Sequence, residues 1–192
     1  MAPRVKVTKE SIIETAIDLI RRQNVGAINA RSIAASLGCS TQPIFSNFTS
    51  MEELQSAVIA EAYSLYLDFI KAEIESEKHP PYKSMGMAYI RFAREERELF
   101  KLLFMRDRTG EDLSPSPDFK KSVEIIMQAN GLSYEKASLL HLEMWSCVHG
   151  IATMLATSFL ILEWELISDM LTDIYQGIRT RYKTEEKKDA CN

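Results

Sequence analysis

Glycine and proline are scarce in this sequence, and cysteine is scarcer still. The 192 residues include seven glycines and six prolines, too few for the many tight turns of an all-β fold. The three cysteines, Cys39, Cys147 and Cys191, are widely spaced, which excludes a disulfide framework and a zinc knuckle. The first nine residues contain no apolar segment of the kind found in signal peptides. These absences predict a soluble, reduced protein of the cytoplasm.

Apolar and charged residues are both plentiful. Hydrophobic residues make up 46% of the chain and charged residues 26%, a composition that excludes a disordered polymer. A chain of this length can bury a sizeable core in one or two domains.

Charge is distributed unevenly along the chain. Residues 1–50 carry six basic and three acidic side chains, and hence a formal charge of +3. Because the whole chain carries −4, the remaining residues carry −7. This asymmetry indicates that the N-terminal segment is the part that contacts an anionic partner.

One long segment, residues 144–162, contains no charged side chain. Its length approaches that of a membrane-spanning helix. It includes several polar residues, and glutamates rather than basic residues flank it, against the usual pattern of membrane proteins. We therefore expect a helix that is buried on most sides, inside a bundle or a dimer interface, and no association with a membrane.

Apolar residues recur with helical spacing along most of the chain. They predict an all-α fold with a three-helix head over residues 1–50, a helical-bundle body over 51–183 and a flexible tail over 184–192. Thr8, Ser50 and Ser133 are the predicted N-caps, and Glu53 forms a capping box with Ser50. About nine helices are expected, at residues 9–24, 31–37, 42–48, 51–77, 82–94, 97–106, 117–130, 134–160 and 163–182.

Two of the short helices in the head have the layout of a helix-turn-helix. They are separated by Gly38-Cys39-Ser40, and Gly38 permits the left-handed backbone that such a sharp turn requires. Ala34 is small where the two helices must approach closely. The second helix of the pair would enter the major groove of DNA. Its hydroxyl and amide side chains suit phosphates and base edges.

The head resembles the DNA-binding domain of TetR-family transcriptional regulators. The resemblance is carried by Ile33-Ala34, Gly38-Cys39-Ser40, Phe45-Ser46-Asn47-Phe48 and Glu53-Leu54. In the remainder, Trp145-Ser-Cys-Val-His149-Gly150 resembles the Trp/His-Gly signature of one TetR subgroup. The resemblance implies a helix-turn-helix DNA-binding domain over 1–50 and a ligand-binding and dimerisation domain over 51–183.

The resemblance also implies a homodimer that binds a palindromic DNA operator and represses transcription. Phe45 replaces the family's usual tyrosine and Asn47 a common histidine. We therefore expect weak nonspecific DNA affinity unless a basic N-terminal arm compensates. The expected DNA-binding residues are Lys6, Lys9, Arg31, Ser40, Thr41, Gln42, Pro43, Phe45 and Asn47.

The body is expected to sense a small molecule of unknown identity, whose binding would shift the population between DNA-binding and non-binding states. No cofactor is predicted. His141 and His149 lie two helical turns apart, but a metal site lacks a third ligand because Cys147 is on another face. Hydrogen-bonded structural histidines are favoured over a metal sensor. The candidate pocket residues are Tyr63, Tyr66, Tyr89, Phe92, Phe100, Phe104, Met127, Met144, Trp145 and His149.

The last predicted helix is apolar on more than one face, which a single core rarely requires. We expect the last two helices to pair with their two-fold copies in a four-helix interface; a wider core within one chain is the alternative. The predicted interface residues are Met154, Phe159, Leu166, Ile167, Met170, Leu171 and Ile174.

Two other classes of function compete with a DNA-binding regulator. The sequence contains no nucleophile elbow, phosphate loop, dinucleotide fingerprint or H-E-x-x-H motif, so an enzyme is not expected. The alternative reading is a helical protein-interaction module that has lost sequence-specific DNA binding, because the second helix of the pair carries little positive charge.

Overall fold

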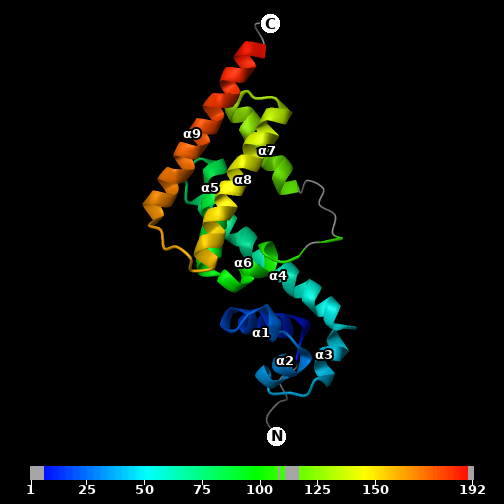
Figure 1. Ribbon diagram of the computed structural model, residues 1–192. Coiled ribbons are helices and arrows are strands. Elements are labelled where there is room, and N and C mark those ends of the chain that lie inside the picture. The colour runs from blue at the N-terminus through cyan, green and yellow to red at the C-terminus, as the bar shows by residue number, and fades with distance from the viewer. Residues whose placement is uncertain (1–6, 108, 111–116, 190–192) are drawn as a thin grey trace. The chain divides into compact units, whose positions relative to one another are not determined.

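The computed structural model describes residues 7–107, 109–110 and 117–189. Throughout these ranges the regular structure is helical, which confirms the predicted all-α fold (Figure 1). The helices are α1 (Lys9–Arg22), the 3₁₀ turn η1 (Val25–Ala27), α2 (Ala30–Ser36), α3 (Gln42–Asn47), α4 (Met51–Glu75), α5 (Pro81–Glu95), α6 (Arg97–Phe104), α7 (Pro117–Asn130), α8 (Tyr134–Ala156) and α9 (Trp164–Asp189).

The chain forms two compact units. The head unit comprises Met1–Asp68 and Glu95–Arg106, and the body unit comprises Phe69–Arg94 and Asp107–Asn192. This division differs from the predicted boundary at residue 50: the first part of α4 belongs to the head unit, and so does α6, which packs against α1 and η1. A bidentate ion pair joins Arg21 of α1 to Glu96, at the start of α6. The guanidinium of Arg21 donates to both carboxylate oxygens of Glu96, at 2.9 and 2.7 Å.

The head unit is built on a small apolar core. Ile12 and Ile20 of α1, Ile33 of α2 and Ile44 of α3 are fully buried. Thr8 caps α1 as predicted, with its hydroxyl oxygen accepting from the Ser11 N–H at 3.2 Å. These contacts fix α1 as the support against which the two short helices pack.

The start of α4 is capped in a slightly different way from the predicted box. The Ser50 hydroxyl accepts from the Glu53 N–H at 3.2 Å, as expected. The Glu53 carboxylate accepts instead from the Thr49 N–H and hydroxyl, at 2.6 and 2.7 Å. These two bonds and the nearby Lys9 ammonium lower the pKa of Glu53 to about 2.

In the body unit, α8 packs against both α7 and α9 (Figure 1). Ser133 caps α8 as predicted. Gly86 of α5 lies where a Cβ atom would be 3.4 Å from Val148 and 3.6 Å from Leu171, so α5 sits close to both long helices. Glu73 is buried and pairs with Arg91 at 2.8 Å. The Arg91 guanidinium in turn lies over the Trp164 ring and fixes the start of α9.

The ends of the last two helices differ from the prediction. α8 ends at Ala156 rather than residue 160, because Ser158 adopts a left-handed backbone with φ 57°. The Phe159 N–H then donates to the Met154 carbonyl and the Ser158 N–H to the Leu155 carbonyl, the Schellman arrangement usually made by glycine. α9 continues to Asp189, through most of the segment predicted as a tail.

Among the described residues, each helix is too short or too polar to cross a membrane. The charge-free segment is divided between the end of α8 and the loop before α9.

Candidate DNA-binding surface and ligand sites

A helix-turn-helix is formed by α2 and α3. Asn29 starts α2, since its side-chain oxygen accepts from the Arg31 and Ser32 N–H groups at 3.0 and 2.9 Å. Gly38 follows α2 with φ 64°, the left-handed conformation expected from the sequence. The Cys39 N–H donates to the Ala34 carbonyl at 3.0 Å. The local sequence therefore dictates the turn that orients α3.

Most of the predicted DNA-contacting side chains are accessible. Arg31, Ser40, Gln42 and Phe45 are exposed, and Thr41 and Pro43 are half-buried. Thr41 stands at the N-cap of α3 without a side-chain capping bond. Pro43 lies in the first turn of α3, where its missing N–H leaves no bond unmade. The start of α3 thus presents a hydroxyl and an amide.

Three other predicted contacts stand apart from this group. The Asn47 amide donates to the Pro43 carbonyl at 2.8 Å and to the Val7 carbonyl at 3.5 Å, so a phosphate contact would have to replace one of these bonds. Lys9 is exposed, pairs with Glu53 at 3.2 Å and lies 5.0 Å from the Phe48 ring centroid. Lys6 lies outside the described residues.

Positive charge on this surface is sparse. Arg31 is the only charged residue in the sequence between positions 23 and 50. The nearest basic residues along the chain, Arg21 and Arg22, each approach Asp18 within 4 Å, and Arg21 also pairs with Glu96. Neutral hydrogen-bonding groups therefore dominate the helix-turn-helix surface.

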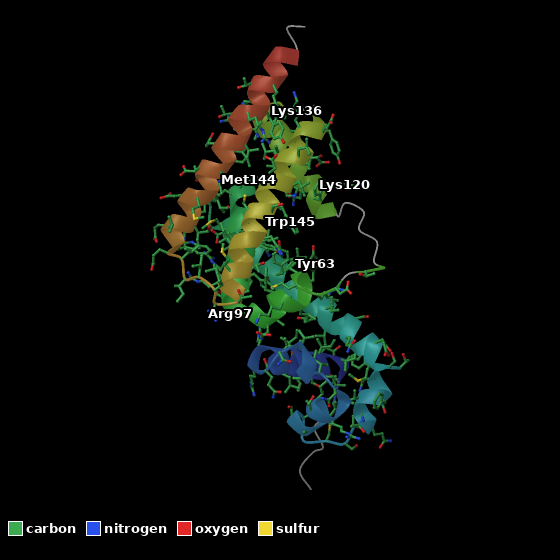
Figure 2. The ribbon with its side chains drawn as sticks, in the orientation of Figure 1. Tyr63, Arg97, Lys120, Lys136, Met144 and Trp145 are labelled. Atoms are coloured by element: carbon green, nitrogen blue, oxygen red, sulfur yellow. The ribbon has the colours of Figure 1, made fainter. Side chains whose placement is uncertain are left out.

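The predicted pocket residues do not form one cluster. Tyr63, Tyr66, Phe100 and Phe104 belong to the head unit, where neighbouring rings lie 5.2 to 5.7 Å apart. Tyr89, Phe92, Met127, Met144, Trp145 and His149 belong to the body unit. Figure 2 marks Tyr63 on α4, and Met144 and Trp145 on α8. Helical periodicity identifies apolar positions but does not assign them to one cavity.

Two tyrosine–histidine pairs join α5 to α8. The Tyr82 hydroxyl lies 2.9 Å from His141 Nδ1, and the Tyr89 hydroxyl 2.8 Å from His149 Nδ1. Trp145 stacks on His149 with a centroid distance of 5.0 Å. Burial lowers the pKa of His141 to about 4 and that of His149 below its ordinary value. Each histidine is therefore hydrogen-bonded to a tyrosine of α5, and the described residues hold no cluster suited to a metal ion.

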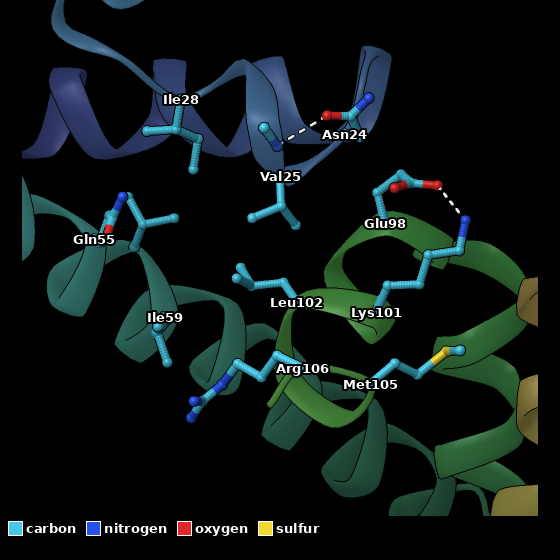
Figure 3. Close-up of a pocket in the computed structure, with 12 residues that line it drawn as sticks. Asn24, Val25, Ile28, Gln55, Ile59, Glu98, Lys101, Leu102, Met105 and Arg106 are labelled. Carbon is cyan, nitrogen blue, oxygen red and sulfur yellow. Dashed lines mark hydrogen bonds and ion pairs between the residues drawn. The ribbon is translucent and has the colours of Figure 1, made fainter. Parts of the chain in front are cut away.

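A groove of about 570 Å³ lies in the head unit (Figure 3). It is bordered by the segment around η1, by one face of α4 and by α6. None of the predicted pocket residues lines it. No sequence pattern predicts this groove, because its lining comes from three segments that are separated along the chain.

The predicted dimer residues fall into two groups. Ile167 and Leu171 are buried within the single chain, so their faces of α9 already have partners. Phe159 and Leu166 are 75% and 49% exposed, and Met154, Met170 and Ile174 are half-buried. Ile161, which is not among the predicted interface residues, is 91% exposed.

Residues 82–173 match the family model of the tetracyclin repressor-like C-terminal domain. This stretch is therefore similar to the C-terminal domain of tetracyclin repressor-like proteins. The chain is also 21% identical over 191 residues to an uncharacterized HTH-type transcriptional regulator of Mycobacterium tuberculosis, a match that covers 94% of this chain and 86% of that protein. The two similarities are thus to a tetracyclin repressor-like C-terminal domain and to an HTH-type transcriptional regulator.

Solved structures share the TetR-like fold. A TetR-like transcriptional regulator from Rhodococcus sp. RHA1 superposes with a TM-score of 0.67 at 14% identity, over 92% of this chain and 97% of that one. A protein of unknown function from the same organism gives 0.73 at 20% identity, over 92% and 98%. A TetR family member from Streptomyces coelicolor A3 gives 0.56 at 13% identity, over 86% and 96%. At these identities the likenesses establish the fold alone.

Proposed function

We propose that this TetR-like chain is a homodimeric repressor that reads a palindromic DNA operator through α3, and whose DNA affinity changes when a small molecule binds the body unit. The observation that carries the proposal is the helix-turn-helix itself. Gly38 sets its turn, and the side chains at the start of α3 are accessible.

Residues in the first turn of α3 are proposed to contact the DNA bases. The exposed Gln42 amide can donate to and accept from adenine in the major groove, and the Thr41 hydroxyl can serve either a base edge or a phosphate. Phe45 has no hydroxyl and offers apolar contact. Arg31 supplies a phosphate contact at the start of α2. Lys9 supplies another when its ammonium leaves the Glu53 carboxylate and binds a DNA phosphate instead. The arm that includes Lys6 is proposed to add further phosphate contacts.

Dimerisation is proposed to use the exposed sides of α8 and α9. Leu142, Trp145 and Leu166 are large apolar side chains that the single chain leaves accessible. A Cβ atom at Gly150 of α8 or Gly177 of α9 would meet nothing within 4 Å, so each glycine leaves room for a second helix to approach. Exposed apolar area together with open backbone suits self-association about a two-fold axis. Phe159, Met154, Met170 and Ile174 extend this surface.

The effector is proposed to bind among the aromatic residues of the body unit. Tyr89 and His149 would provide polar groups and Phe92, Met127 and Met144 apolar ones, a mixture suited to a small organic ligand. α4 belongs to both units, so a ligand that favours one arrangement of α4 would alter DNA affinity. Such coupling is reciprocal and is typically worth about 1–3 kcal/mol.

Fluorescence anisotropy of the full-length protein on DNA from upstream of its own gene tests DNA reading. A scrambled DNA of equal length serves as competitor. We expect saturable binding that survives the competitor. Gln42→Ala should weaken it about 30-fold or more, because each of two copies loses a base contact worth about 1–3 kcal/mol. Gln128→Ala, at an exposed glutamine of α7, is the matched control and should bind like the parent.

If this DNA contains no operator, the same assay is repeated on genomic fragments selected by binding. Failure to enrich any fragment over scrambled DNA would contradict the proposed function. Equal affinities of the Gln42→Ala and Gln128→Ala variants would contradict the role assigned to α3.

A further inference from the structure

Lys9, the first residue of α1, lies beside the end of α3. Its ammonium pairs with the Glu53 carboxylate at 3.2 Å and lies 5.0 Å from the centroid of the Phe48 ring. Phe48 directly follows α3 and is buried. The amide of Asn47, the last residue of α3, donates to the Val7 carbonyl at 3.5 Å. The start of α1 is therefore held against the end of the helix that is proposed to enter the major groove.

The Glu53 carboxylate is held in place independently of Lys9. It accepts hydrogen bonds from the Thr49 N–H and hydroxyl at 2.6 and 2.7 Å. The Glu53 N–H donates in turn to the Ser50 hydroxyl at 3.2 Å. Because these bonds already order the glutamate, its side chain loses little further entropy when it pairs with Lys9. The side chains of Lys9 and Glu53 remain 50% and 38% exposed, so a phosphate can reach the ammonium from solvent.

A DNA phosphate and the Glu53 carboxylate compete for the same donors of Lys9. Both are oxyanions that accept charge-assisted hydrogen bonds from an ammonium. A phosphate must displace the ammonium from Glu53 or lie beside a second negative charge, and either event weakens DNA binding. We propose that Glu53 is an intramolecular competitor, which lowers the affinity of the head unit for the DNA backbone and leaves more of the discrimination to base contacts. This role rests on the proposed function, which makes DNA the anionic partner of Lys9.

The test compares Glu53→Gln with Glu52→Gln in the full-length protein, by fluorescence anisotropy on scrambled DNA at one salt concentration. In Glu53→Gln the amide oxygen can still accept from Thr49, but the negative charge is gone. An exposed ion pair restrains its cation by roughly 1.4- to 5-fold, and the factors of two head units multiply in a dimer. Glu53→Gln should therefore raise DNA affinity by about 2- to 30-fold.

Glu52→Gln is the matched control. Glu52 is the exposed neighbour of Glu53 in the first turn of α4, and in the described part of the chain its carboxylate is not paired with Lys9. The control removes the same formal charge and so measures the general repulsion between a carboxylate and DNA. Its gain in affinity should be clearly smaller than that of Glu53→Gln.

A double-mutant cycle assigns the effect to Lys9. In a Lys9→Gln background, the Glu53→Gln and Glu52→Gln changes should raise DNA affinity equally, because no ammonium remains to be released. Equal affinities of the two glutamate variants in the parent background would overturn the proposal. A larger gain from Glu53→Gln that persists without Lys9 would overturn it as well, since the carboxylate would then act on DNA directly.

Heparin chromatography separates the role of Glu53 from the proposed function. Heparin is a polyanion without bases, so retention requires accessible cations but no operator. Glu53→Gln should elute at higher salt than Glu52→Gln, and the Lys9→Gln background should remove the difference. Later elution of Glu53→Gln, combined with no DNA fragment enriched over scrambled DNA, would contradict operator binding and support the competition. Equal elution of the two glutamate variants would overturn the competition even where the parent binds an operator.

Discussion

The sparse charge of the helix-turn-helix makes a quantitative prediction about salt. Arg31 and Lys9 are the two described cations placed to contact phosphate, which gives four contacts in a dimer. Log affinity should then fall against log salt concentration with a slope of about −3.6, or about 150-fold between 50 and 200 mM salt. Arg31→Gln removes two of the four contacts. Its slope should be about −1.8, and its affinity should fall only about 12-fold over the same range.

The measurement is fluorescence anisotropy of the parent and the Arg31→Gln variant on one operator at four or more salt concentrations. Arg4 and Lys6 are the other basic residues of the N-terminal arm. If they also contact phosphate, the parent slope steepens to about −7, but the difference of about 1.8 between the two proteins remains. Equal slopes for parent and variant would refute the placement of Arg31 on phosphate. Ser36→Ala, an exposed change on the same helix, should leave the slope at its parent value.

Three further predictions concern stability and assembly. Gly38→Ala should lower the free energy of unfolding by about 1–2 kcal/mol, since φ is 64° and the site is otherwise open, and urea denaturation measures the change. Leu166→Glu should raise the dimer dissociation constant at least about 100-fold, because an unpaired carboxylate in an interface costs about 3 kcal/mol or more. A dimer of this variant that persists in sedimentation equilibrium would exclude this face of α9 from the interface. Leu171→Glu is unsuitable for this test because Leu171 is buried within the chain. The pKa of His141 falls from 6.5 to about 4 on folding, so the unfolded chain binds more protons than the folded chain between these pH values. The free energy of unfolding is therefore unaffected by His141 above pH 6.5. It decreases as the pH falls toward 4, by at most about 3 kcal/mol. His141→Phe should flatten that part of the stability–pH curve.

Much of the helical architecture could be read from local patterns. Thr8 and Ser133 act as predicted caps, and Gly38 adopts the left-handed backbone expected after a helix. These features depend on bonds between residues a few positions apart, which the sequence specifies directly. The end of α8 was missed because Ser158 takes the left-handed position, which a search for glycine does not detect.

The candidate sites were only partly predictable. The accessible start of α3 follows from the helix-turn-helix pattern, and Gln42 and Arg31 are exposed as that pattern requires. The Asn47 amide, by contrast, is bound to the Pro43 and Val7 carbonyls. Its partner Val7 lies forty positions away, and no local pattern connects the two residues.

Side-chain periodicity also could not distinguish apolar residues of the chain's own core from apolar residues that remain exposed. A stripe on α9 is apolar whether it faces its own chain or a second copy, and only packing shows that Ile167 and Leu171 are buried while Leu166 is exposed. The same applies to the aromatic residues assigned to one pocket, which the structure divides between two units.

The sequence by itself determined the helices, their caps and the turn between α2 and α3, because these depend on near neighbours along the chain. The tertiary structure alone decided which apolar faces are covered, which hydrogen-bonding groups are already engaged, and that η1, α4 and α6 enclose a groove. Those outcomes depend on contacts between residues far apart in sequence, and such contacts leave no periodic signal.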